Sequence, residues 1–171
     1  MNLNFSESID KQEVFNSIDK YLASLNLTPV AKDFERPWGG FFVIDEKQAR
    51  QFASIFFADR EFSDIQLNRK LSPKILIVAP DKRLSWQYHF RRSEIWKVIG
   101  GKAGVVTSDS DVEGTPQKLD VDDVIELTQG TRHRLVGLDT WGIIAEIWQH
   151  TDPAQPSDEE DIVRVQDDFG R

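Results

Sequence analysis

The sequence RLSWQYHFRRSEIWKVIGG, Arg83 to Gly101, decides the fold of this chain. It combines apolar and aromatic residues with a short break of charges and ends in two glycines, which is typical of two strands joined by a turn. Yet an eight-residue span inside this core-like sequence contains three side chains that can bind metals, Gln87, His89 and Glu94. This spacing raises the hypothesis of a site built into the strands.

The faces of the two predicted strands bring these polar groups together. Alternate side chains share one face of a strand, so Gln87 and His89 project together. Trp86, Tyr88 and Phe90 are then expected to pack on the other face. A turn at 90–93 returns Glu94 close to His89. His133 begins a later strand and can face the same interior in a closed barrel. The alternative is that Gln87 and His89 are exposed polar residues on a solvent-facing strand.

The four residues Gln87, His89, Glu94 and His133 would supply two nitrogen and two oxygen ligands. Such a mixed set suits Zn²⁺, Fe²⁺, Mn²⁺, Co²⁺ or Ni²⁺. A metal that keeps one position open to water can act as a Lewis acid. The third histidine of the chain, His150, is predicted to be a surface or capping residue.

The sequence from Leu71 onward predicts an all-β fold. Short segments rich in Val, Ile and Trp alternate with clusters of Gly, Pro, Asp and Thr, which favours a sandwich or barrel. The segments are PKILIVAP, RLSWQYHF, EIWKVIGGKAGVVTSD, QKLDVDDVIELTQG, RHRLVGL and WGIIAEIWQH. There is no βαβ alternation and no phosphate-binding glycine loop, which disfavours a doubly wound nucleotide fold.

Helices are predicted only outside this region. Val14, Ile18, Leu22 and Leu25 recur at helical spacing within residues 7–25, with Ser6 or Ser8 as the cap. A strand is expected at 41–44, followed by a short inserted helix within 46–62. The acidic C-terminal stretch from 151 to 171 is, on composition alone, typical of a solvated tail.

Composition restricts the class of protein. The chain has 171 residues, which suits one domain, and a formal net charge of −8, which disfavours nucleic-acid binding. No apolar run is long enough to span a bilayer, and the N-terminus lacks the features of a signal peptide. The absence of cysteine fits a reducing compartment, so we expect a cytoplasmic protein without membrane partners.

At four places the sequence resembles a known family. It is similar to the cupin superfamily and, within it, to the C-terminal domain of type II mannose-6-phosphate isomerases. The family's Leu-Ser-x-Gln-x-His…Arg-x-Glu-x-Trp pattern is matched by residues 84–96, and its His-Arg-Leu element by residues 133–135. Its Arg-Pro-Trp-Gly opening is matched by residues 36–39, and its acidic ending with Gly-Arg by EEDIVRVQDDFGR, residues 159–171.

This resemblance implies a cupin β-barrel over residues 35–171, preceded by a helical extension over 1–34, with an ordered C-terminal segment. It implies Gln87, His89, Glu94 and His133 as ligands of one divalent metal, preferably zinc, and Arg92 as the residue used in isomerisation. Arg164 and Arg171 are our own candidates for binding a phosphate.

The sequence departs from the family pattern at several positions. A run of three histidines is common where this chain has His89, Phe90 and Arg91, and histidine is common at Ile95. Pro80-Asp81 replaces Pro-Gly, and the segment 46–72 has no counterpart in the pattern. These 171 residues also lack the nucleotide motif of the guanylyltransferase domain to which this domain is often fused, so we expect no guanylyltransferase activity from them.

The resemblance implies an isomerase that interconverts mannose 6-phosphate and fructose 6-phosphate. One alternative is a cupin that binds a sugar phosphate or similar anion without turnover. Another is a different metal-dependent cupin enzyme such as an oxygenase, although the glutamine in the predicted ligand set disfavours it. Since cupins commonly pair through their barrels, a homodimer is expected.

Overall fold

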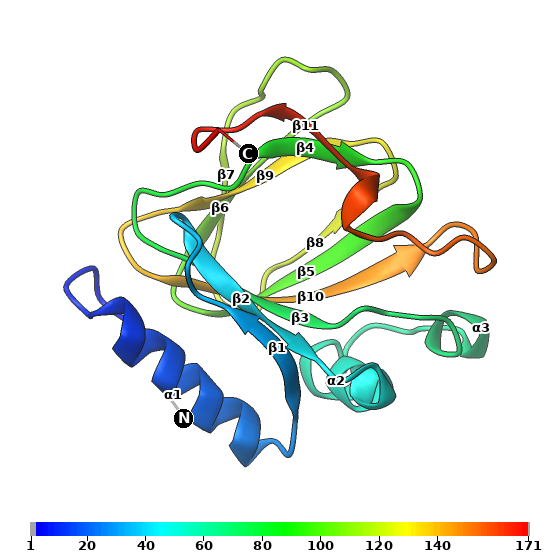
Figure 1. The fold of residues 1–171 in the computed structure, drawn as a ribbon, viewed down its shortest axis with the longest axis horizontal. Coiled ribbons are helices and arrows are strands. Elements are labelled where there is room, and N and C mark those ends of the chain that lie inside the picture. Colours follow the sequence, from blue (N-terminus) through cyan, green and yellow to red (C-terminus); the bar gives the residue numbers. More distant parts are fainter. Residues whose placement is uncertain (1–2, 171) are drawn as a thin grey trace.

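The computed structural model describes residues 3–170, and its strands form two antiparallel sheets that face each other as a flattened barrel (Figure 1). One sheet has the order β1-β2-β3-β10-β5-β8 and the other the order β11-β4-β9-β6-β7. The strands are β1 (Pro29–Asp33), β2 (Gly39–Ile44), β3 (Lys74–Val78), β4 (Trp86–His89), β5 (Arg92–Gly100), β6 (Ala103–Ser108), β7 (Gln117–Leu119), β8 (Val124–Leu127), β9 (Arg132–Gly137), β10 (Gly142–His150) and β11 (Ile162–Gln166). The all-β prediction is therefore confirmed.

The central strands β3 and β10 of the six-stranded sheet are buried on both faces, which explains their continuous apolar sequences. In β3, Leu76 and Val78 face the barrel interior, whereas Ile75 and Ile77 belong to a second cluster on the outer face. This second cluster includes residues of α1 (Lys11–Ser24) and α2 (Ala49–Phe56), and both helices lie along that side of the sheet (Figure 1). The sheet thus separates an outer apolar core from a barrel interior.

The N-terminal helix covers the chain's own barrel. Val14, Ile18 and Leu22 are fully buried, as their helical spacing predicted. The helix begins later than we expected: its cap is Asp10, which accepts a hydrogen bond from the Gln12 N–H, rather than Ser6 or Ser8. No helix within residues 3–170 is long and apolar enough to cross a bilayer.

Two further segments differ from the composition-based expectations. The strand β1 was not predicted. It pairs with β2, so residues before 35 contribute to the sheet. The boundary between a helical extension over 1–34 and a cupin domain over 35–171 stays a prediction. The C-terminal stretch is ordered, because β11 pairs with β4 and follows a short 3₁₀ helix, η2 (Glu159–Asp161). The resemblance predicted this order, whereas composition alone favoured a solvated tail.

The inserted segment contains the expected helix. It begins with a 3₁₀ turn, η1 (Glu46–Gln48), continues into α2, and ends with the short helix α3 (Asp64–Leu67). Phe52 and Phe56 of α2 are buried in the outer cluster.

Just before β4, Asp81 has a φ of 56°, the left-handed conformation that suits the glycine of the family pattern.

Candidate metal centre

Three strands bring the predicted ligands into the barrel. His89 ends β4, Glu94 lies near the start of β5, and His133 lies in β9. In the sheet register, Gln87 of β4 lies directly opposite His133. Period-two alternation then directs Glu94 and Trp96 inward while Ile95 packs in the outer cluster. The convergence that the sequence predicted is thus present for the two histidines and the glutamate.

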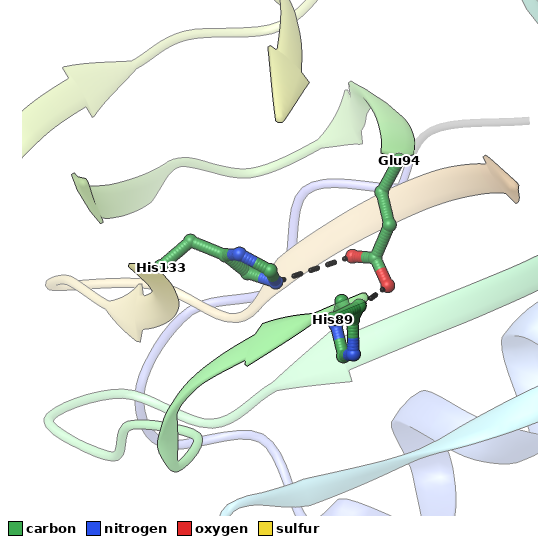
Figure 2. A group of neighbouring side chains, drawn as sticks. All are labelled: His89, Glu94 and His133. Carbon is green, nitrogen blue, oxygen red and sulfur yellow. Dashed lines mark ion pairs between the residues drawn. The ribbon is translucent and has the colours of Figure 1, made fainter. Parts of the chain in front are cut away.

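The carboxylate of Glu94 lies between the two imidazoles (Figure 2). His89 Nε2 is 3.1 Å from Glu94 Oε1, and His133 Nε2 is 3.4 Å from Glu94 Oε2. The side chains of all three residues are only 2% exposed. One donor atom from each residue lies within 4.8 Å of the others, so this buried His-Glu-His group can hold a metal ion.

The hydrogen bonds of His133 fit a metal ligand. Its Nδ1 lies 2.9 Å from the carbonyl oxygen of Thr131, which is an acceptor and therefore assigns the ring proton to Nδ1. The other nitrogen, Nε2, is buried and finds no hydrogen-bond partner among the residues that the structure describes. A buried lone pair aimed at a carboxylate is costly unless a cation or proton joins the two groups, so the residues present fit a divalent metal.

Electrostatics keep His89 and Glu94 in the protonation states that bind metals. Burial lowers the pKa of His89, despite the neighbouring Glu94 charge, so its imidazole is neutral near pH 7. Burial alone would raise the pKa of Glu94, yet Arg92 and the two histidines hold it well below its usual range. A neutral imidazole and an ionised carboxylate are the forms that bind metals.

Arg92 is buried, although a turn position would leave it exposed. Its Nε donates to Glu94 Oε1 at 2.8 Å, and its Nη2 lies 3.1 Å from His89 Nε2. The guanidinium also stacks 3.6 Å from the ring centroid of Trp148. Its Nη1 donates to Ser157 Oγ at 2.8 Å, which ties it to the C-terminal segment. Because Arg92 bonds the same atoms that a metal would bind, the guanidinium and the ion compete for them.

Two of the remaining predicted site residues, Gln87 and Arg164, lie at the cavity beside this group, and the third lies outside the described residues. Gln87 is half-buried, lines the adjoining cavity and accepts a hydrogen bond from Ser85 Oγ at 2.6 Å, so its role as a ligand stays a prediction. Arg164 is exposed on β11 opposite Gln87 and also lines the cavity. Arg171 lies outside the described residues.

A cavity of about 90 Å³ adjoins the group inside the barrel. Trp38, Trp96 and Trp148 line it together with Arg92 and Glu94. The indole N–H groups of Trp38 and Trp148 are buried, and neither has an acceptor within residues 3–170. Aromatic faces beside unpaired donors are suited to a ligand that has both carbon–hydrogen surface and oxygen acceptors.

Glu146 of β10, which was not predicted from the sequence, also lines the cavity. The indole N–H of Trp96 donates to Glu146 Oε1 at 2.9 Å and to Glu94 Oε2 at 3.1 Å, so it bridges the two carboxyl groups. Burial and the nearby Glu94 charge raise the pKa of Glu146 to about 8. The signal was available, because an acid within the apolar run GIIAEIW is unusual and shares a strand face with Trp148.

Three of the positions that depart from the family pattern, Phe90, Arg91 and Ile95, lie away from this cavity. Phe90 packs edge-on against Tyr88, with ring centroids 5.1 Å apart, and is 57% exposed. Arg91 bonds Asp158 Oδ1 at 2.9 Å on the C-terminal segment, and Ile95 packs in the outer cluster. His150 is not on the surface as predicted: it is 4% exposed, and its Nδ1 accepts a hydrogen bond from the Ser157 N–H at 2.8 Å.

The chain matches one protein-family model. The model is described as mannose-6-phosphate isomerase C-terminal, and the match covers residues 45–167. The matched range includes the segment 46–72 and leaves out the opening motif at 36–39. A search of curated proteins found no match.

Solved structures with a similar fold are cupins. A variant of oxalate decarboxylase OxdC from Bacillus subtilis has a TM-score of 0.56 at 12% identity, covering 78% of this chain and 30% of its own. Vicilin from Solanum lycopersicum (tomato) has a TM-score of 0.53 at 16% identity, covering 78% and 35%. The capsular polysaccharide assembling protein CapF from Staphylococcus aureus has a TM-score of 0.50 at 16% identity, covering 82% and 34%. This chain spans about a third of each, and the likeness confirms the cupin fold.

Proposed function

Because the chain belongs to the mannose-6-phosphate isomerase C-terminal family, we propose that it is a metal-dependent sugar-phosphate isomerase that interconverts mannose 6-phosphate and fructose 6-phosphate. One observation carries the proposal: the buried His89–Glu94–His133 group adjoins Arg92 at a cavity lined by tryptophans. The departures from the family pattern at Phe90, Arg91 and Ile95 leave the lining of that cavity unchanged, which favours an enzyme over a cupin that only binds its ligand.

The reaction moves two protons and needs no oxidant. In the open-chain aldose, the proton on C2 leaves and the carbonyl oxygen O1 gains one, which gives a cis-enediol. The enediol then gains a proton on C1 and loses the proton of the C2 hydroxyl, so the carbonyl moves to C2. The site must therefore stabilise negative charge on two neighbouring oxygens and must hold a proton during the transfer.

The metal would be held by His89, Glu94 and His133, with Gln87 as the fourth ligand that the resemblance implies. Among the divalent metals that suit two imidazoles, a carboxylate and an amide oxygen, we propose zinc, which the resemblance favours. When bound, this ion supplies a Lewis acid that stabilises negative charge on oxygen.

Arg92 is suited to stabilise the oxyanion rather than to remove a proton. Its guanidinium is a delocalised cation with no lone pair free to accept a proton, and it carries several donors in a fixed plane. Stacking on Trp148 and the hydrogen bond to Ser157 fix its orientation. The substrate oxygens can then accept from N–H groups that are already ordered, which lowers the cost of reaching the transition state.

Glu146 is the candidate that carries the proton. It is buried at the cavity, its carboxyl is oriented by the Trp96 indole, and it makes none of the contacts that define the His-Glu-His group. We expect Glu146→Gln, which keeps the shape and the Trp96 hydrogen bond, to lower kcat by about 100-fold or more while metal content stays unchanged. Turnover close to that of the wild type would remove Glu146 from the mechanism.

A coupled assay that detects fructose 6-phosphate tests the function. The protein, purified without an affinity tag and supplied with Zn²⁺, Co²⁺ or Mn²⁺, is expected to turn over mannose 6-phosphate. A metal-loaded protein that shows no turnover, but whose melting temperature rises with the sugar phosphate, would establish a binding module instead. Oxygen consumption with Fe²⁺ would point to an oxygenase.

A further inference from the structure

An ion pair between Lys74 and Glu159 marks the mouth of the cavity. Lys74 Nζ lies 3.0 Å from Glu159 Oε1. Both residues line the cavity and also an adjoining groove of about 490 Å³, which shares Arg36, Phe41 and Trp148 with it. A ligand that enters the barrel along this groove would pass the pair.

The two partners are held very differently. Lys74 is part of β3, its side chain is 13% exposed, and its Nζ lies 4.1 Å from the ring centroid of Trp148. Glu159 is 70% exposed and belongs to the C-terminal segment. The cation is therefore a fixed part of the barrel wall, whereas the carboxylate can turn into solvent at little cost.

The position of Glu159 is one that favours an anion. Desolvation at the cavity mouth opposes the charge of Glu159 although the side chain is largely exposed, and Lys74, Arg92 and Arg164 together hold its pKa below the usual range. Arg36, whose guanidinium lies 5.8 Å from the Phe41 ring centroid, adds a fourth cation to the cavity lining. Three carboxyl groups, Glu94, Glu146 and Glu159, share this lining, and Glu94 is paired with Arg92. If Glu159 turns away, the remaining cations favour a negatively charged ligand.

We propose that the Glu159 carboxylate occupies the place of the ligand's phosphoryl group, and that a phosphate displaces it to bind Lys74. This inference rests on the proposed function for its ligand class, a sugar phosphate, and it assigns the phosphate to Lys74 on the side of β3. A phosphate dianion carries more charge and more acceptor oxygens than one carboxylate, so it can replace Glu159 at this cation.

Two substitutions are expected to act in opposite directions on phosphate binding. Lys74→Met removes the cation and keeps the aliphatic chain, so the affinity for inorganic phosphate is expected to fall about tenfold. Glu159→Gln removes the competing carboxylate, so the affinity is expected to rise about threefold or more. Isothermal titration calorimetry on the full chain as purified, at equal metal content, measures both.

The Lys97–Asp122 pair provides a matched control. Lys97 Nζ lies 3.0 Å from Asp122 Oδ1, the side chains are 15% and 78% exposed, and neither residue lines the cavity or the groove. Lys97→Met and Asp122→Asn therefore make the same changes of charge in a similar setting elsewhere. We expect both to leave the affinity for phosphate unchanged.

Several results would overturn the inference. These are unchanged binding in Lys74→Met, weaker binding in Glu159→Gln, or equal effects in the control pair. Because Glu159 is exposed, its variant is expected to fold normally even if Lys74→Met does not. The titration requires no turnover, so it is independent of the isomerase assay. An inactive protein that still shows the opposite shifts would retain the anion site and lose only the reaction.

Discussion

Among single residues, Arg92 is the one whose substitution separates catalysis from metal binding. It contacts Glu94 and His89 but is a cation, so it cannot be a metal ligand itself. We expect Arg92→Gln to reduce kcat by about 100-fold or more, because the ordered donors to the oxyanion are lost. Metal content, measured by plasma mass spectrometry, is expected to stay at the wild-type level or rise.

The result for Arg92 can be separated from general damage. Arg92→Lys keeps the charge but not the planar donors, so it should recover only part of the activity. If Arg92→Gln lost its metal together with its activity, the residue would support the metal site rather than the reaction.

His150 is expected to make stability depend on pH. Burial, followed by the charges of Lys70 and Arg92, lowers its pKa from 6.5 to about 4. As pH falls from about 7 to 4, the unfolded chain takes up the proton first, so the stabilising contribution present above pH 7 is lost across this window. Urea unfolding at pH 7 and pH 4.5 gives the loss in the free energy of unfolding between these two pH values. In His150→Gln this loss is expected to be smaller by roughly 2 kcal/mol. An equal loss in the wild type and the variant would contradict this assignment.

At the scale of elements, Asp161 fixes the C-terminal segment onto the turn between β4 and β5. Its carboxylate accepts hydrogen bonds from the N–H groups of Phe90 and Arg91 at 3.1 and 2.9 Å, and from Ser157 Oγ at 2.6 Å. Asp161→Ala would leave these donors without an acceptor, so we expect the free energy of unfolding to fall by about 3 kcal/mol.

The control for this prediction is Asp152→Ala. Asp152 is exposed, and its side chain accepts only from the Ala154 N–H among the described residues, at 2.8 Å. Urea unfolding is expected to show a loss below about 1 kcal/mol for this variant. Similar losses for both variants would mean that Asp161 does not fix the segment.

The sequence predicted strands well where side chains alternate strongly, and poorly where a segment becomes a strand only by pairing with a neighbour. Alternation placed Gln87 with His89 and directed Glu94 inward, because strand geometry is local. The strand β1, PVAKD, shows no such alternation and becomes a strand by pairing with the edge of β2. The burial of His150 also escaped prediction, since it depends on Ser157 and Ser72 folding over it from other segments.

In the whole molecule, the six-stranded sheet lies between the helices α1 and α2 and the cavity that contains the candidate metal centre. The outer face of this sheet packs against α1 and α2, and its inner face presents Glu94, Trp96, Glu146 and Trp148. The C-terminal segment closes the other side through β11 and supplies Glu159 and Arg164 at the cavity. The expected homodimer stays a prediction, which light scattering of the purified chain can check.

If the buried His89–Glu94–His133 group is a metal centre, the purified protein must contain a metal ion. Plasma mass spectrometry of the protein purified without an affinity tag is expected to find about one divalent ion per chain. Glu94→Ala is expected to lose that ion, while Glu126→Ala, which removes an exposed partner of Arg60, is expected to keep it. Equal metal content in wild type and Glu94→Ala, or no metal in either after incubation with Zn²⁺, would contradict the account.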